Sequence, residues 1–172
     1  MAATYEPIAS VTLGSTSTSV TFSSIPATYT DLVVACSARF GSASGSRIRF
    51  NSDTATNYSS TYLLGQASAA SSGRFSSVTS IRNNHIWGDA TVANQFTPYG
   101  VSIQSYSSTS VYKTVLWTYG TGGGLQGSNS ETGKIVGLWR STAAITTIEF
   151  APFNATSYQI GSTFSLYGIK AA

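Results

Sequence analysis

The chain consists of short segments in which apolar and hydroxyl-bearing side chains alternate, separated by clusters of Gly, Ser and Asn. A period of two puts successive side chains on opposite faces of an extended strand, so this pattern predicts half-buried β-strands. Residues 8–13 and 17–23 show it on either side of the turn residues 14–16 and predict a hairpin. A turn near residues 141–145 is the one helical candidate. We therefore expect an all-β fold.

Turn and loop signals divide the chain into about ten to twelve strands, at a spacing typical of sandwiches and barrels. No fixed-period repeat is visible, which argues against propellers and β-helices. Residues 66–76 are small and polar and predict a mobile surface loop, and the glycines of residues 121–133 argue against a regular element there. The sequence predicts one antiparallel β-sandwich of jelly-roll type over residues 8–172, preceded by an attachment segment at residues 1–7. The expected strands span residues 8–13, 17–23, 31–40, 46–51, 58–65, 77–88, 97–106, 111–120, 133–141, 145–152 and 161–171.

Length and composition agree with one packed domain. The chain has 172 residues and a mass of 18.0 kDa, and 41% of its residues are hydrophobic, which suffices for a core. No apolar run approaches the roughly 18 residues that span a bilayer, and the N-terminus lacks the basic start and apolar stretch of a secretory signal. We therefore expect no membrane partner and synthesis in a cytosol. Cys36, the single cysteine, is expected to be a small buried hydrophobic residue.

Ionisable side chains are scarce: charged residues make up 9% of the chain, and there is one histidine. Catalysis needs such groups to converge in one site, so their scarcity argues against an enzyme. His85 precedes Asp89 by four residues, but Gly88 interrupts the strand that would align them, and we expect His85 to be structural. Glycoside hydrolysis needs two carboxylates facing each other. The acids are instead spread singly, at Glu6, Asp31, Asp53, Asp89, Glu131 and Glu149.

The basic residues give the chain a formal net charge of +3 and a pI of about 9.1. Nucleic-acid binding needs a block or stripe of Lys and Arg that neutralises successive phosphates. Here no such block exists, so we expect no nucleic-acid partner. Glu149, in the strand pattern ITTIEF, is expected either to face solvent or to pair with an arginine. The arginines, spread along the chain, are Arg39, Arg47, Arg49, Arg74, Arg82 and Arg140.

Two further segments bear on metal and cofactor binding. Asn51, Asp53 and Asn57 offer oxygen atoms, but their segment lacks the closing bidentate Glu and the turn Gly of an EF-hand. A cluster of Asx-turns is the better interpretation. The glycine-rich residues 121–127 lack the Gly-Lys-Ser/Thr ending of a phosphate-binding loop, and no helix pattern follows. We therefore expect neither a metal nor a cofactor.

Aromatic side chains are the remaining candidates for a recognition surface. The chain has ten tyrosines and three tryptophans, residue types enriched at interfaces. These rings could form a surface patch, or they could pack inside the sandwich, where we place Trp117 and Trp139. The candidate patch residues are Trp87, Tyr99, Tyr106 and Tyr112, to which Tyr119 could be added.

A set of segments spread along the chain carries a family resemblance: ATYEPIASVTL, SSIPATYTDLVV, FNSDTATNYSSTYL, GLWRSTAAITTIEF and GSTFSLYGIKA. Together they resemble small β-rich structural proteins of tailed bacteriophages, particularly aquatic phages, described as virion or tail-fibre proteins. The resemblance runs from about residue 3 to residue 171. It implies a virion-surface jelly roll that works as an oligomer, with trimers common, and no active-site residues to carry over.

The first functional hypothesis is a capsid decoration protein of the cement or head-knob type. It would bind the major capsid protein or other virion proteins through Thr4, Tyr5, Glu6 and Pro7, or through one edge of the sandwich. Few charges would let symmetric copies pack without like-charge repulsion, so we expect a homo-oligomer. The resemblance implies that this homo-oligomer is a trimer. The expected location is the virion surface, after assembly in the host bacterial cytoplasm.

The alternative hypothesis is a tail-fibre or receptor-binding module that recognises host surface glycan. Aromatic and hydroxyl side chains of residues 66–76, 87–99 and 121–133 would form its site. A glycan-cleaving enzyme would need a pair of carboxylates that the sequence does not show.

Overall fold

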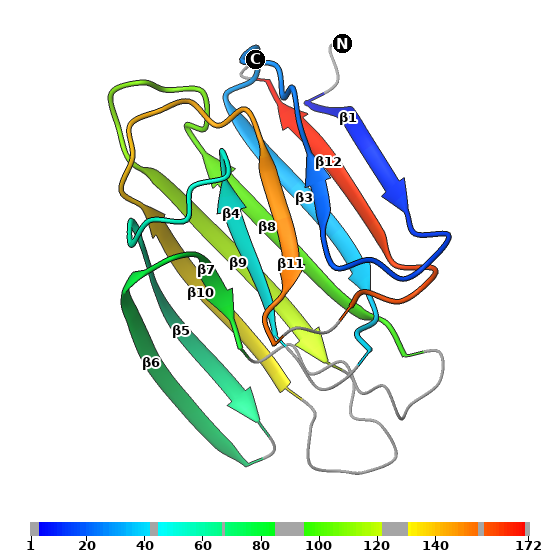
Figure 1. The fold of residues 1–172 in the computed structure, drawn as a ribbon. Coiled ribbons are helices and arrows are strands. Elements are labelled where there is room, and N and C mark those ends of the chain that lie inside the picture. The colour runs from blue at the N-terminus through cyan, green and yellow to red at the C-terminus, as the bar shows by residue number, and fades with distance from the viewer. Residues whose placement is uncertain are drawn as a thin grey trace.

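The computed structural model describes residues 4–41, 45–66, 68–84, 95–121, 131–154 and 157–170. In these residues the chain forms twelve β-strands and no helix, which confirms the all-β prediction (Figure 1). The turn expected near residues 141–145 is not helical. The strands are β1 (Tyr5–Thr12), β2 (Val20–Phe22), β3 (Asp31–Ala38), β4 (Ser46–Phe50), β5 (Tyr58–Gln66), β6 (Ala69–Val78), β7 (Ile81–Asn83), β8 (Thr97–Gln104), β9 (Lys113–Thr121), β10 (Glu131–Trp139), β11 (Ile148–Pro152) and β12 (Thr163–Ile169).

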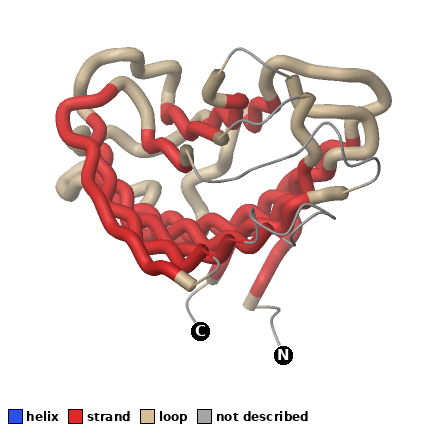
Figure 2. Tube along the Cα trace, turned by 90° about the horizontal axis from the view of Figure 1, so that it is seen from below, coloured by secondary structure: helices blue, strands red, loops and turns tan. Residues whose placement is uncertain are grey.

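The strands form two antiparallel sheets that face each other as a sandwich, as predicted. The large sheet has eight strands in the order β1-β12-β3-β8-β9-β10-β5-β6, and the small sheet has four in the order β2-β11-β4-β7. The large sheet forms a curved layer, and the small sheet lies over its concave side (Figure 2). Within the described residues, β1 and β6 are therefore the edge strands of the large sheet.

Four strand pairs are nested in the sequence. The first strand pairs with the last, and each further pair lies between the two strands of the pair before it. β1 pairs with β12, β2 with β11, β3 with β8, and β4 with β7. The hairpins β5–β6 and β9–β10 extend the large sheet beyond β8. Consequently, β1 to β4 lie alternately in the large and the small sheet.

The hairpin predicted from residues 8–13 and 17–23 is wrong. β1 belongs to the large sheet and β2 to the small sheet. The segment between them is held by backbone hydrogen bonds from Leu13 N to Ser162 O at 2.9 Å and from Ser17 N to Tyr158 O at 3.0 Å. Alternation specifies which side chains share a face, but it does not specify the partner strand. Consecutive strands can therefore separate into different sheets.

Aromatic and aliphatic side chains fill the space between the sheets. Trp117 and Trp139 are almost fully buried there, as predicted. Rings of the two sheets meet directly: the Phe50 centroid lies 5.5 Å from that of Trp139, and the Phe150 centroid lies 5.8 Å from that of Phe164. Each tilted pair contributes about 1 kcal/mol beyond the burial of its surface. These contacts fasten the small sheet to the concave side of the large one.

Cys36 lies in β3 and is buried, as predicted. Burial raises the pKa of its thiol, against a smaller opposing effect of a hydrogen bond with Tyr99. A thiol that stays protonated is a poor nucleophile and a poor metal ligand. The residue therefore acts as part of the core.

Two boundaries differ from the prediction. Residues 66–76, expected to be a loop, contribute most of β6, which pairs with β5. An edge strand that buries little surface does not need alternating apolar residues. The small polar residues of β6 therefore lack the pattern from which a strand is predicted. β1 begins at Tyr5, so Tyr5, Glu6 and Pro7 belong to the sheet and not to a separate attachment segment.

Substitution of Gly137 in β10 tests the close packing of the two sheets. A Cβ at this position would lie 2.7 Å from side-chain carbons of Ile81 in β7, which is fully buried. We expect Gly137→Ala to lower the free energy of unfolding by about 1–3 kcal/mol, because the core must expand to admit the methyl group. In the control, Gly120→Ala of β9, a Cβ meets nothing within 4 Å. Urea unfolding compares the two, and equal stabilities would contradict the packing.

Candidate functional site

The outer face of the large sheet carries few charges. Side chains alternate along each strand, so the residues between the buried positions point outward. In the described strands these outward positions hold mostly hydroxyl-bearing, apolar and glycine residues, and the charged ones are Asp31, Arg74 and Lys134. Asp31 begins β3, and Arg74 lies on the edge strand β6. Lys134 is thus the charged residue that lies away from the strand ends and sheet edges on this face of the described strands.

Apolar side chains gather on this face over β5, β9 and β10. Val136 is paired across the strands with Leu116, and Lys134 is paired with Leu63. The exposed fractions of Leu63, Leu116 and Val136 are 62%, 41% and 52%. Single exposed apolar residues are ordinary, but these are neighbours on adjacent strands. We call Leu63, Leu116, Lys134 and Val136 the outer patch.

Sequence reasoning missed the outer patch, although the sequence contains a signal for it. Apolar residues follow one another in β5 at Leu63–Leu64, in β9 at Val115–Leu116 and in β10 at Ile135–Val136. A strand with one solvated face should instead show apolar residues at every second position. The loss of alternation in three neighbouring strands marks a surface whose outer side is apolar as well.

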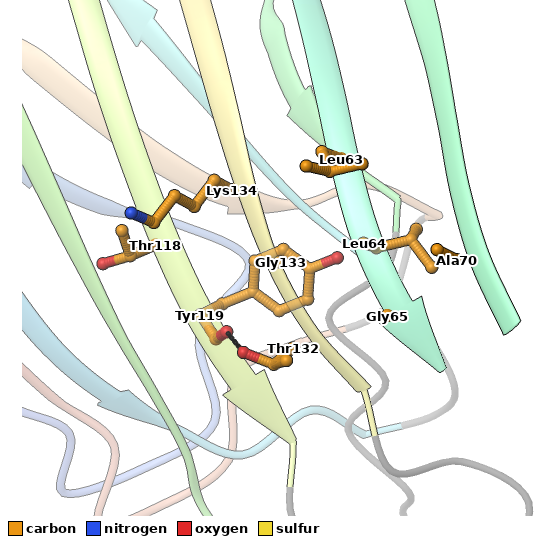
Figure 3. Close-up of a pocket in the computed structure, with 9 residues that line it drawn as sticks. All are labelled: Leu63, Leu64, Gly65, Ala70, Thr118, Tyr119, Thr132, Gly133 and Lys134. Carbon is orange, nitrogen blue, oxygen red and sulfur yellow. Dashed lines mark hydrogen bonds between the residues drawn. The ribbon is translucent and has the colours of Figure 1, made fainter. Parts of the chain in front are cut away.

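Glycine and small residues hollow the outer face beside the outer patch. A depression of about 420 Å³ is lined mainly by outward residues of β5, β9 and β10 (Figure 3). Lys134 and Thr118 are cross-strand partners on one side of it, and Leu63 lies on the other. A second depression of about 490 Å³ shares Thr118, Tyr119 and Thr132 with the first. An ammonium group and hydroxyls above an apolar floor can bind a polar ligand or a partner side chain.

The acidic side chains of the described residues each have a structural partner. Glu6, expected in the N-terminal attachment segment, lies in the edge strand β1 and forms an ion pair with Lys170. Glu149 pairs with Arg47, which is one of the two outcomes expected for it. No group of three or more His, Cys, Asp or Glu that could hold a metal ion occurs in the described part of the chain. His85 and Asp89 lie outside it. The pairs are Glu6–Lys170 (2.8 Å), Asp31–Ser105 N (2.7 Å), Asp53–Trp139 (2.7 Å), Glu131–Tyr119 (3.0 Å) and Glu149–Arg47 (3.2 Å).

Asp53 organises the turn that was weighed as a metal loop. Its Oδ1 accepts a hydrogen bond from the backbone N–H of Ala55 at 2.8 Å, which confirms the Asx-turn. Its Oδ2 accepts bonds from Trp139 Nε1 at 2.7 Å and Asn57 Nδ2 at 2.9 Å. Partial burial raises the pKa of the Asp53 carboxyl, but these hydrogen bonds together bring it below its ordinary value. The carboxylate thus ties the turn to the core.

The recognition patch predicted from aromatic residues is not assembled by the described residues. Tyr99 and Tyr106 are buried, with 4% and 0% of their surface exposed, so of the two alternatives for these rings the surface patch is wrong and packing inside the sandwich is right. Tyr99 takes an inward position on β8, where its ring centroid lies 5.6 Å from that of Trp117. Tyr112 is 54% exposed, and Trp87 lies outside the described residues, as do residues 122–130 of the predicted glycine-rich segment.

The N-terminal contact residues lie at the edge of the large sheet. Tyr5 of β1 is 56% exposed, and Thr4 accepts a backbone hydrogen bond from Lys170 at 3.2 Å. Pro7 lacks an N–H group, and a bulge follows it between Pro7 and Ala9. Both features limit the addition of another strand at this part of the edge. Contact here would therefore be made by side chains.

Comparisons of the chain with protein-family models, with curated proteins and with solved structures found no match. None of the described residues forms a helix long and apolar enough to cross a membrane.

The Asp53 turn predicts a specific response to acid. A carboxyl whose pKa is lowered on folding stabilises the fold above its ordinary pKa of 3.8, and this contribution is lost as pH falls through the folded value. We expect Asp53→Asn to be less stable than the parent protein at pH 7 and the difference between the two stability curves to shrink as the pH falls below 3.8. Urea unfolding across this range measures both. Parallel curves would contradict the role given to the carboxylate.

Proposed function

We propose that this chain is a structural protein of a phage virion that works by packing its surfaces against neighbouring subunits. The observation that carries the proposal is the outer face of the large sheet, whose described strands present few charges. A broad neutral face suits contact with other protein surfaces. The resemblance to virion proteins of tailed phages points in the same direction. No enzymatic activity is part of the proposal.

The outer patch supports association between copies of the chain. In a symmetric assembly each patch meets its own copy or a neighbour's, so any charge on it is repeated across the interface. Leu116 and Val136 are apolar and exposed, so copies of these two side chains can meet across an interface without like-charge repulsion. Burial of this surface contributes about 25 cal/mol per Å² toward association, which must exceed the loss of translational and rotational freedom. We therefore propose a homo-oligomer, and the family resemblance suggests a trimer.

The strand order supports a jelly roll as the particular type of sandwich. A jelly roll has eight strands in two sheets, formed by two Greek keys. Here the four nested pairs supply eight strands, with four in each sheet, and the β5–β6 and β9–β10 hairpins are additions to one sheet. Jelly rolls occur in viral capsid and lectin domains, which suits either function considered for this chain.

We propose that the chain decorates the capsid, as a cement or head-knob protein. The sequence offered two contact surfaces, the N-terminal residues and one edge of the sandwich. These are one surface, because Tyr5, Glu6 and Pro7 begin the edge strand β1. Its blunted edge favours side-chain contact, with the exposed Tyr5 ring as the anchor on the major capsid protein. The protein would be assembled in the cytoplasm of the bacterial host and displayed on the virion surface.

The depression beside Lys134 favours a second candidate, a tail-fibre module that recognises host glycan. Lys134 and Thr118 offer hydrogen-bond donors above a floor that includes Leu63 and Gly65. Sugar sites combine such donors with apolar surface. In this alternative the depression is the recognition site.

Self-association through the outer patch is tested by placing a charge on it. We expect Val136→Asp to weaken oligomerisation by about 2 kcal/mol or more, because the interface would bury a carboxylate in place of apolar surface. The control is Ile160→Asp, at a residue that is 54% exposed, against 52% for Val136, but lies in a turn outside the sheets. Light scattering during size-exclusion chromatography measures the mass of each variant. A monomeric parent protein, or equal effects of both changes, would contradict the proposal.

Location on the particle separates the two candidates. Immunogold labelling of purified virions should mark the heads, and Tyr5→Ala should lower the number of copies bound per head because the anchor ring is lost. The control is Tyr112→Ala, which removes an equally exposed ring from the β8–β9 connection. Label confined to the tail would exclude capsid decoration and favour the glycan-binding module.

A further inference from the structure

Arginines far apart in the sequence meet on the outer face of the small sheet. Arg47 and Arg49 point outward from β4, and Arg82 points outward from β7. Glu149 of β11 is the acid that joins them in the described residues. Three arginines and one glutamate leave this face with a net charge of +2, out of +3 for the whole chain. We call Arg47, Arg49, Arg82 and Glu149 the arginine face.

The positive charges on this face are held close together. Arg47 and Arg82 are direct cross-strand partners, an arrangement that is destabilising for like charges. Burial and the neighbouring Arg49 lower the pKa of Arg47, and Glu149 opposes them. Burial and Arg49 also lower the pKa of Arg82. The fold therefore maintains a concentration of charge that an incoming anion would relieve.

Glu149 shows how this face holds a carboxylate. Its Oε1 lies 3.2 Å from Arg47 Nη1 and 4.0 Å from Arg49 Nη1, so one oxygen attracts both guanidinium groups. The side chains of Arg47 and Glu149 remain 22% and 31% exposed. Arg47 Nη1 itself is buried and makes no hydrogen bond within the described residues, so the exposed part of this side chain lies elsewhere on the group. One internal carboxylate does not neutralise the three guanidinium groups of the cluster.

Arg82 is the member of the cluster for which no acid is at hand in the described chain. Its guanidinium lies over the ring of Phe153, with 4.7 Å from Cζ to the ring centroid. Stacking engages the flat face of the group and leaves its N–H edge directed sideways. Its Nε is buried and has no hydrogen-bond partner in the residues that the structure describes, so this nitrogen is not open to a ligand. The Phe153 ring fixes the guanidinium beside Arg47, its cross-strand partner.

We propose that the arginine face binds the carboxylates of an acidic protein surface, with a partner carboxylate bridging Arg47 and Arg82 as Glu149 bridges Arg47 and Arg49. The planar guanidinium fork matches a carboxylate, and Glu149 already demonstrates the pairing within the chain. A compact cluster fits a local group of Asp and Glu side chains better than the extended phosphate stripe of a nucleic acid.

This inference rests on the proposed structural function, and it identifies a partner chemistry for the second face of the sandwich. The outer patch on the large sheet would join copies of the chain, and the arginine face on the small sheet would attach them to an acidic neighbour. Because the two surfaces lie on opposite outer sides of the sandwich, either can fail its test without the other.

Fluorescence anisotropy of a labelled hexaglutamate peptide at low ionic strength tests the proposal. We expect Arg82→Gln to weaken binding by about fivefold, and Glu149→Gln to strengthen it by a similar factor, because the latter removes the competing internal carboxylate. Arg74→Gln, on the exposed edge strand β6, makes the same change in net charge away from the cluster and should leave the affinity within about twofold. Thermal unfolding of each variant establishes that it is folded.

Two probes of other chemistry complete the experiment: an oligogalacturonate and a single-stranded oligothymidine. Hexaglutamate binding that responds to Arg82→Gln and Glu149→Gln in opposite directions supports the proposal. Equal losses in Arg82→Gln and Arg74→Gln would reduce the effect to net charge and overturn it. Binding of the saccharide or the oligonucleotide without binding of hexaglutamate would also overturn it, because the partner would belong to another class.

Discussion

Rings from the two sheets meet at Phe50–Trp139 and Phe150–Phe164, and this contact holds the small sheet against the concave side of the large one. Every strand that contributes to the contact must turn one set of alternate side chains inward. The other set is then displayed on an outer face, whatever its chemistry. Inter-sheet packing therefore decides which residues become surface and which distant residues become surface neighbours.

The two outer faces produced in this way differ in their electrostatics. The large sheet displays hydroxyl, apolar and glycine positions, with Lys134 as the charge inside the face. The small sheet displays three arginines around Glu149. A neutral face tolerates its own copy across an interface, whereas a cationic face repels its copy and attracts acid. The sandwich is thus suited to two kinds of neighbour, one on each side.

The candidate surfaces were harder to predict than the fold. Tyr99 and Tyr106 are candidates for a surface patch by residue type, but Tyr99 takes an inward position on β8 and Tyr106 is buried in the turn that follows it. Residue type alone cannot distinguish a buried ring from an exposed one. The arginines were considered dispersed because they are separated along the chain; pairing of β4 with β7 brings Arg47 opposite Arg82. Asp53 was assigned correctly because an Asx-turn depends on residues close in sequence.

Local alternation by itself determined that this chain folds into β-strands, which side chains share a face, and that Trp117 and Trp139 lie in the core. These properties follow from a period of two, which needs no knowledge of distant residues. Only the tertiary structure decided that β1 pairs with β12 and not with β2, that residues 69–78 complete an edge, and that the outer patch and the arginine face form. The reason is that backbone hydrogen bonds between strands are alike at every position, so the partner is chosen by the packing of both sheets together.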